Sequence, residues 1–157
     1  TYIGFVLAAE PFLLSPAAIG LVFIVYLSSL FTTPFTGWLV SRFGRRNLGL
    51  MVICTWICGI LLTLVASIPA IVGGLMIAAA SGFYIQTCCQ SFVSTHVHDG
   101  KSSAIGLYVT AFYIGGSFGG LIPGLIWNAS GWHGTVALIV AMLLCMSAMI
   151  RFAWKAA

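Results

Sequence analysis

The sequence has 157 residues, of which 61% are hydrophobic and only 5% are charged. An average soluble chain carries about 25% charged residues, so this one has too few polar side chains to cover a surface exposed to water. The six basic and two acidic residues give a net charge of +4, which is too little to coat a phosphate backbone. The composition therefore excludes a soluble enzyme, a disordered segment and a nucleic-acid-binding protein, and it predicts an integral membrane protein.

Runs of about 20 apolar residues predict an all-α, polytopic transmembrane helix bundle. Residues 1–9 have the composition of the end of a span, which indicates a fragment of a longer protein. Glu10-Pro11 and Ser15-Pro16 then mark a loop, because proline interrupts helices. The full spans follow in chain order at residues 17–40, 48–66, 70–93, 104–127 and 135–152.

The loops between these spans differ in charge, and the difference predicts the orientation. Successive loops lie on opposite sides of the membrane, so basic residues in alternate loops all fall on one side. Loops rich in lysine and arginine stay in the cytoplasm. The sequence therefore predicts a multi-pass protein of the cell membrane (inner or plasma) with a cytoplasmic C-terminus. The basic residues that carry this prediction are Arg42, Arg45, Arg46, Lys101, Arg151 and Lys155.

The loop at residues 37–46, Gly-Trp-Leu-Val-Ser-Arg-Phe-Gly-Arg-Arg, is the most specific segment. It resembles the G-x-L-x-D-R-x-G-R-R loop of the major facilitator superfamily, which joins the second and third helices of each six-helix half. Ser41 stands where the family has the aspartate of a charge-relay latch, so the resemblance does not extend to that latch. The alternative is an ordinary positively charged loop. The matching positions are Gly37, Arg42, Gly44, Arg45 and Arg46.

Each residue type of this loop has a physical role. Gly37 permits a close approach of neighbouring helices, and Gly44 permits the positive φ of a tight turn. The three arginines are fixed charges that pair with carboxylates, helix C-termini or anionic lipid headgroups.

A second resemblance lies on the span at 104–127. Its glycines and proline follow the spacing G-x8-G-x3-G-G-x2-P-G, which is similar to the antiporter motif G-x8-G-x3-G-P-x2-G-G of the same superfamily. Small residues four apart let helices pack closely, so we expect Gly119 and Gly120 at a helix–helix contact. The alternative is a generic glycine seam. The motif positions are Gly106, Gly115, Gly119, Gly120, Pro123 and Gly124.

The order of elements resembles the C-terminal half of the drug and sugar efflux proton antiporters in this superfamily. Residues 2–4, 14–16 and 19–21 are similar to the junction between their seventh and eighth helices. In that register, residues 1–157 form one six-helix domain with a truncated first helix, equivalent to helices seven to twelve. The resemblance implies that the partner is a missing N-terminal half of the same transporter.

In the superfamily, helices seven, eight, ten and eleven border the central cavity, so polar residues on them are candidates for the transport path. A hydroxyl or amide in hydrocarbon is costly unless it is paired or hydrated. Gln86, near the middle of its span, is the best single candidate, and Tyr84 points to a different face. Each candidate has the alternative role of hydrogen bonding to a neighbouring helix. The candidates are Tyr2, Tyr26, Tyr84, Gln86, Tyr108 and Tyr113.

The resemblance implies a secondary active transporter that exports a small molecule by proton-coupled alternating access. The full spans contain no acidic residue, so the proton relay is expected in the missing half. The five cysteines lie in apolar runs and His96 and His98 lie in a loop, so no metal site, cofactor or enzymatic activity is expected. The alternatives are a half-size protein that pairs with a second copy or a separate partner, and a non-transporting packing or assembly subunit.

Overall fold

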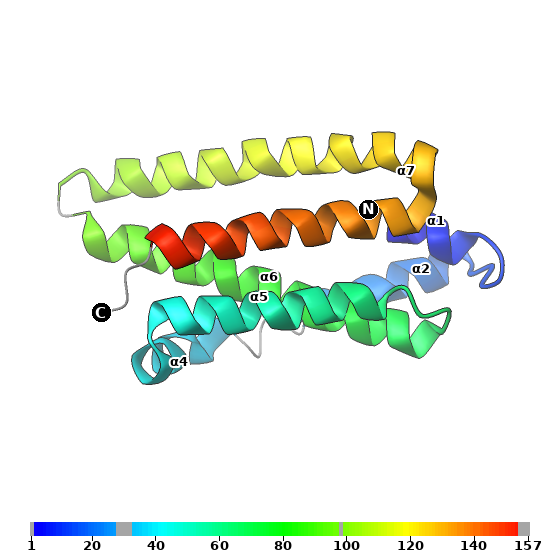
Figure 1. The fold of residues 1–157 in the computed structure, drawn as a ribbon, viewed down its shortest axis with the longest axis horizontal. Coiled ribbons are helices and arrows are strands. Elements are labelled where there is room, and N and C mark those ends of the chain that lie inside the picture. The colour runs from blue at the N-terminus through cyan, green and yellow to red at the C-terminus, as the bar shows by residue number, and fades with distance from the viewer. Residues whose placement is uncertain (1, 28–32, 98, 154–157) are drawn as a thin grey trace.

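The computed structural model describes residues 2–27, 33–97 and 99–153, which form an elongated helical bundle (Figure 1). Within these residues every regular element is a helix and no strand occurs. The predicted all-α membrane bundle is therefore confirmed. The elements in chain order are α1 (Ile3–Ala8), α2 (Pro16–Val22), the 3-10 helices η1 (Phe23–Leu27) and η2 (Thr33–Phe35), α4 (Thr36–Phe43), α5 (Arg45–Leu62), α6 (Ile68–His96) and α7 (Lys101–Ala153).

Among the described helices, α5, α6 and α7 are long and apolar enough to cross a membrane. α5 and α6 cover most of the predicted spans at 48–66 and 70–93. α6 carries Pro69 in its first turn, where the missing N–H removes no bond within the helix. These two hydrophobic runs thus correspond to helices of membrane-spanning length.

α7 consists of two arms that meet at Gly131. This residue has φ 60° and ψ −150°, a conformation that is essentially restricted to glycine. In Figure 1 the first arm (101–130) and the second arm (132–153) run in opposite directions. They contain the predicted spans 104–127 and 135–152. The loop expected at 128–134 is instead helical on both sides of a reversal at one residue.

The span predicted at 17–40 is not one regular α-helix. α2 is capped by Ser15, whose Oγ accepts a hydrogen bond from the Ala18 amide at 3.3 Å. It continues into η1, and the chain is helical again in η2 and α4. Pro34 in η2 has no N–H and disfavours α geometry in the residue before it, which accounts for the irregular path on that side. Residues 28–32 lie outside the described part.

Two glycines bring the backbones of α5 and α6 into contact. A Cβ atom added to Gly74 would lie 2.5 Å from the carbonyl oxygen of Gly59. One added to Gly59 would lie 2.9 Å from the carbonyl oxygen of Gly74. Both distances are shorter than carbon–oxygen contacts in packed proteins, so the crossing requires glycine on both helices.

The two arms of α7 differ in how they pack. The second arm contributes Leu143 and Ile150 to a buried cluster with Ile53 of α5 and Ile85 of α6. In the first arm, by contrast, residues 111–122 are all exposed. The second arm, α5 and α6 therefore form the core, and the first arm presents an apolar surface outside it.

Candidate functional site

A cavity of about 770 Å³ lies between α1, α2, η1, α5, α6 and both arms of α7. This volume is within the range of about 300–1,000 Å³ that is typical of small-molecule sites. Among the described residues that line it, none is acidic, basic or a histidine. The cavity is therefore uncharged, and aromatic and aliphatic side chains form most of its wall.

Four of the predicted candidates line this cavity, namely Tyr2, Tyr26, Gln86 and Tyr113. Tyr26 is stacked on Phe23, with ring centroids 6.1 Å apart and an interplanar angle of 8°. Its ring also meets the edge of Phe83 at 6.1 Å. Such ring pairs add packing energy beyond the area that they bury. One side of the cavity is thus an aromatic wall built from η1 and α6.

The other two candidates do not line the cavity. Tyr84 is only 5% exposed, and its hydroxyl donates a hydrogen bond to the carbonyl of Thr36 at 3.4 Å. The hydroxyl of Tyr108 donates to the carbonyl of Gln86 at 3.3 Å. The structure thus gives both tyrosines the alternative role of joining helices. The bond from Tyr108 also connects the first arm to the backbone of Gln86, which lines the cavity.

Tyr2 connects α1 to the first arm of α7 beside the cavity. Its hydroxyl donates a hydrogen bond of 2.6 Å to the carbonyl of Gly120. Its ring is stacked on Trp127, with centroids 6.3 Å apart. A Cβ atom added to Gly124 would lie 2.5 Å from the Tyr2 hydroxyl oxygen. Among the glycines of the motif, Gly124 is therefore the one whose missing side chain leaves space for Tyr2.

The remaining motif glycines have no such neighbour. A Cβ atom added to Gly119 or Gly120 would meet nothing within 4 Å, and the same holds for Gly106 and Gly115. The expected helix–helix contact at Gly119 and Gly120 is thus not made within the described chain, where the Tyr2 hydroxyl reaches the Gly120 carbonyl but no atom lies where either Cβ would stand. Gly115, Gly119 and the buried Pro123 line the cavity instead.

The loop motif forms the turn between α4 and α5. Gly44 has φ 75°, the positive value that a tight turn requires. A Cβ atom on Gly37 would meet nothing within 4 Å, so the close approach expected there is absent from the described residues. Ser41 donates a hydrogen bond to the carbonyl of Trp38 at 2.8 Å. Arg42 lies in the last turn of α4, and Arg45 and Arg46 begin α5.

Sequence reasoning missed the aromatic residues that complete the cavity. They are apolar residues in apolar spans, so composition does not separate them from residues that face lipid. Only their positions in the folded structure identify them, because they come from four different elements. They are Phe23, Trp56, Phe83, Phe112, Phe118 and Trp132. Elsewhere in the described chain, no three histidine, cysteine or acidic side chains gather as a metal site would require.

Comparison with known proteins identifies the family. Residues 1–156 of this chain match the family described as the Major Facilitator Superfamily. The chain belongs to this superfamily. The resemblance inferred from residues 37–46 is thereby confirmed at the level of the superfamily, and the protein is a multi-pass membrane protein of a transporter family.

The curated relatives of the chain in this superfamily are transporters. An uncharacterized transporter of Buchnera aphidicola subsp. Baizongia pistaciae is 27% identical over 95% of this chain and 37% of its own length. The uncharacterized MFS-type transporter YybF of Bacillus subtilis is 32% identical over 91% of this chain and 35% of its length. The inner membrane transport protein YnfM of Escherichia coli is 31% identical over 90% of this chain and 34% of its own length. The chain thus spans about a third of the length of these relatives. No solved structure is significantly similar to it.

Proposed function

We propose that the chain is the C-terminal half of a secondary active transporter that exports a small, uncharged or weakly polar molecule by alternating access. The observation that carries this proposal is the uncharged, aromatic-lined cavity of about 770 Å³ in a chain of a transporter superfamily. The proposed activity is transport without chemical change, since the described lining offers no general base, metal ligand set or activated nucleophile.

The cavity wall favours a particular class of substrate. Aromatic rings such as Tyr26 and Phe83 offer stacking surfaces, and the amide of Gln86 offers one hydrogen-bond donor group and one acceptor. A charged substrate would lose its hydration in this cavity without gaining an opposite charge, which is costly. An amphipathic or apolar compound with one or two polar groups therefore fits the wall best.

The exposed face of the first arm supports a second half as partner. Residues 111–122 of this arm are exposed and mostly apolar or glycine. Small residues at Gly115 and Gly119 allow the backbone of another helix to approach closely. In this proposal the N-terminal half of the transporter covers this arm and closes the cavity between the two halves.

Proton coupling is assigned to that other half. The only acidic residues of the sequence are Glu10 and Asp99, and both lie in loops at the ends of helices. A proton-coupled transporter needs a titratable group within the membrane. In this proposal the export of the substrate is driven by proton entry through a carboxylate of the N-terminal half.

Replacing Gln86 with alanine is expected to weaken substrate binding by the full-length transporter about fivefold, as the loss of a hydrogen bond worth about 1 kcal/mol implies. The measurement is gradient-driven transport in proteoliposomes with an imposed pH difference, scored over uncharged drugs, sugars and organic anions. Gln90→Ala is the matched control, because Gln90 lies on the same helix, is exposed and does not line the cavity. The control is expected to transport as the unmodified protein does.

Three outcomes of this assay count against the proposal. Transport that persists after the pH gradient is collapsed would remove proton coupling. Exclusive selectivity for a multiply charged anion would contradict an uncharged cavity. Equal kinetics of Gln86→Ala and Gln90→Ala would remove Gln86 from the site.

The proposed orientation places the basic end of the bundle in the cytoplasm. In Figure 1 the α4–α5 turn, the start of α7 and the end of α7 lie at the same end, and these segments carry every described lysine and arginine. Reporter fusions after Gly100 and after Ala157 are expected to report cytoplasm, and a fusion after Ser130 the outside. A cytoplasmic signal at Ser130 would contradict this orientation.

A further inference from the structure

The turn between α4 and α5 gathers three guanidinium groups. Gly44 ends α4 and precedes α5, so Arg42 lies in the last turn of one helix and Arg45 and Arg46 in the first turn of the next. A cation near the C-terminus of a helix is favourable, whereas one at the N-terminus faces the positive end of the helix dipole. Arg45 and Arg46 therefore occupy positions that the field of their own helix disfavours.

The same two arginines carry unsatisfied donors. The Nε atoms of Arg45 and Arg46 are buried and have no hydrogen-bond partner among the described residues. A buried donor without a partner is costly, and more so on a group that is always charged. Both side chains as a whole are partly exposed, so an anion at the surface of the bundle can reach them. The turn thus has the donors and the charge of an anion site.

The sequence offers few anions to fill this site. Its two carboxylates are Glu10, in the α1–α2 loop, and Asp99, in the α6–α7 loop. Figure 1 places the α1–α2 loop at the opposite end of the bundle from the α4–α5 turn. Neither carboxylate accepts a hydrogen bond from the buried Nε atoms. Asp99 precedes α7, whose start lies at the same end of the bundle as the turn (Figure 1), but it leaves both Nε atoms without a partner, so the site is open to an anion from outside the described chain.

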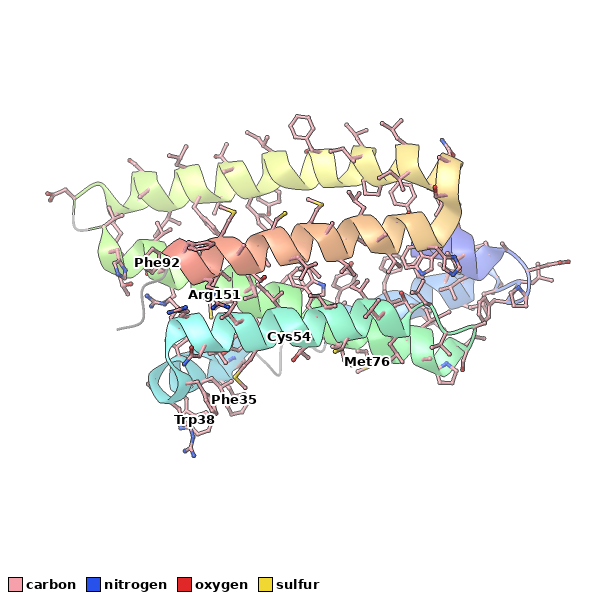
Figure 2. The ribbon with its side chains drawn as sticks, viewed as in Figure 1. Phe35, Trp38, Cys54, Met76, Phe92 and Arg151 are labelled. Atoms are coloured by element: carbon pink, nitrogen blue, oxygen red, sulfur yellow. The ribbon has the colours of Figure 1, made fainter. Side chains whose placement is uncertain are left out.

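The surroundings of the turn indicate where this anion comes from. Phe35 at the end of η2 and Trp38 of α4 are 60% and 59% exposed and project away from the rest of the bundle (Figure 2). The Arg42 guanidinium carbon lies 5.6 Å from the centre of a Trp38 ring, and that of Arg45 lies 5.1 Å from the Phe92 ring centre. Exposed tryptophan beside arginine at the end of a span is typical of the lipid headgroup level.

We infer that the α4–α5 turn binds the phosphate of an anionic phospholipid headgroup. The guanidinium groups of Arg45 and Arg46 bind the phosphate, and the exposed rings of Phe35 and Trp38 lie against the acyl chains. None of these four residues lines the cavity proposed for the substrate, so the site does not depend on which compound is transported.

The test uses the full-length transporter and measures its thermal unfolding midpoint in nanodiscs. Nanodiscs of phosphatidylcholine alone are compared with nanodiscs that contain phosphatidylglycerol. We expect phosphatidylglycerol to raise the midpoint of the unmodified protein and of the control Lys101→Gln, which removes one charge at the same end of the bundle. The double variant Arg45→Gln and Arg46→Gln is expected to lose this rise. Native mass spectrometry of the same proteins counts retained phosphatidylglycerol and does not depend on how stable the variant is.

Each contrary result overturns the inference. If phosphatidylglycerol raised the unfolding midpoint of the double variant as much as that of the unmodified protein, Arg45 and Arg46 would be excluded as the lipid site. A rise produced by inorganic phosphate in phosphatidylcholine nanodiscs would exclude the lipid as the source of the anion. Equal destabilisation of the double variant in both lipids, with unchanged lipid retention, would show that the arginines stabilise the protein through a contact other than the lipid.

Discussion

Gly74→Ala is expected to destabilise the full-length transporter by about 1–3 kcal/mol, the usual cost of overpacking a core. The added methyl group would lie 2.5 Å from the carbonyl oxygen of Gly59 and 3.0 Å from a methyl carbon of Thr63. The carbonyl belongs to the backbone of a packed helix, so relief requires α5 and α6 to separate. The measurement is the thermal unfolding midpoint in detergent or nanodiscs.

Gly73→Ala is the matched control for this variant. Gly73 lies next to Gly74 on α6, and a Cβ atom there would meet nothing within 4 Å. Within a helix, alanine is more favourable than glycine by about 0.5–1 kcal/mol, so this variant is expected to be neutral or slightly more stable. Equal midpoints for the two variants would contradict the contact between the α5 and α6 backbones.

The second large effect is expected at the reversal of α7. Gly131→Ala places a Cβ atom on a residue with φ 60° and ψ −150°, and such strain costs about 1–3 kcal/mol. The variant is expected to lower the unfolding midpoint and to reduce the amount of protein inserted in the membrane, because the two arms no longer meet at the same angle. Ser130→Ala, one residue earlier and exposed, is the control. A normal midpoint for Gly131→Ala would show that a different residue makes the reversal.

The helices themselves could be predicted because hydrophobic length decides them. The run at 70–93 is uncharged, and the structure has α6 over Ile68–His96. The reversal could not be predicted in the same way. Small and polar residues around Ser130 are as typical of a loop as of the last turn of a helix. The conformation of Gly131 decides between these alternatives, and a residue type does not specify its φ and ψ.

The cavity was harder to predict than the helices, since it depends on how each helix is rotated about its axis. Tyr26 and Tyr84 are the same residue type in two of the predicted spans, yet one lines the cavity and the other bonds to the backbone of α4. The contact between Tyr2 and Gly120 joins residues 118 positions apart. Nothing local in the sequence marks such a pair, and the glycines four apart predicted a contact with another helix instead.

The gathering of basic residues at one end of the bundle makes trypsin a side-specific reagent for this protein. The protease cleaves after lysine and arginine, and the α1–α2 loop, the α5–α6 loop and the reversal at Gly131 contain neither. With the proposed orientation, intact cells treated from outside keep this part of the chain whole. Inverted membrane vesicles instead expose the α4–α5 turn and the α6–α7 loop to cleavage. Surface-shaving proteomics that relies on trypsin will therefore miss this region of the transporter, however abundant the protein is.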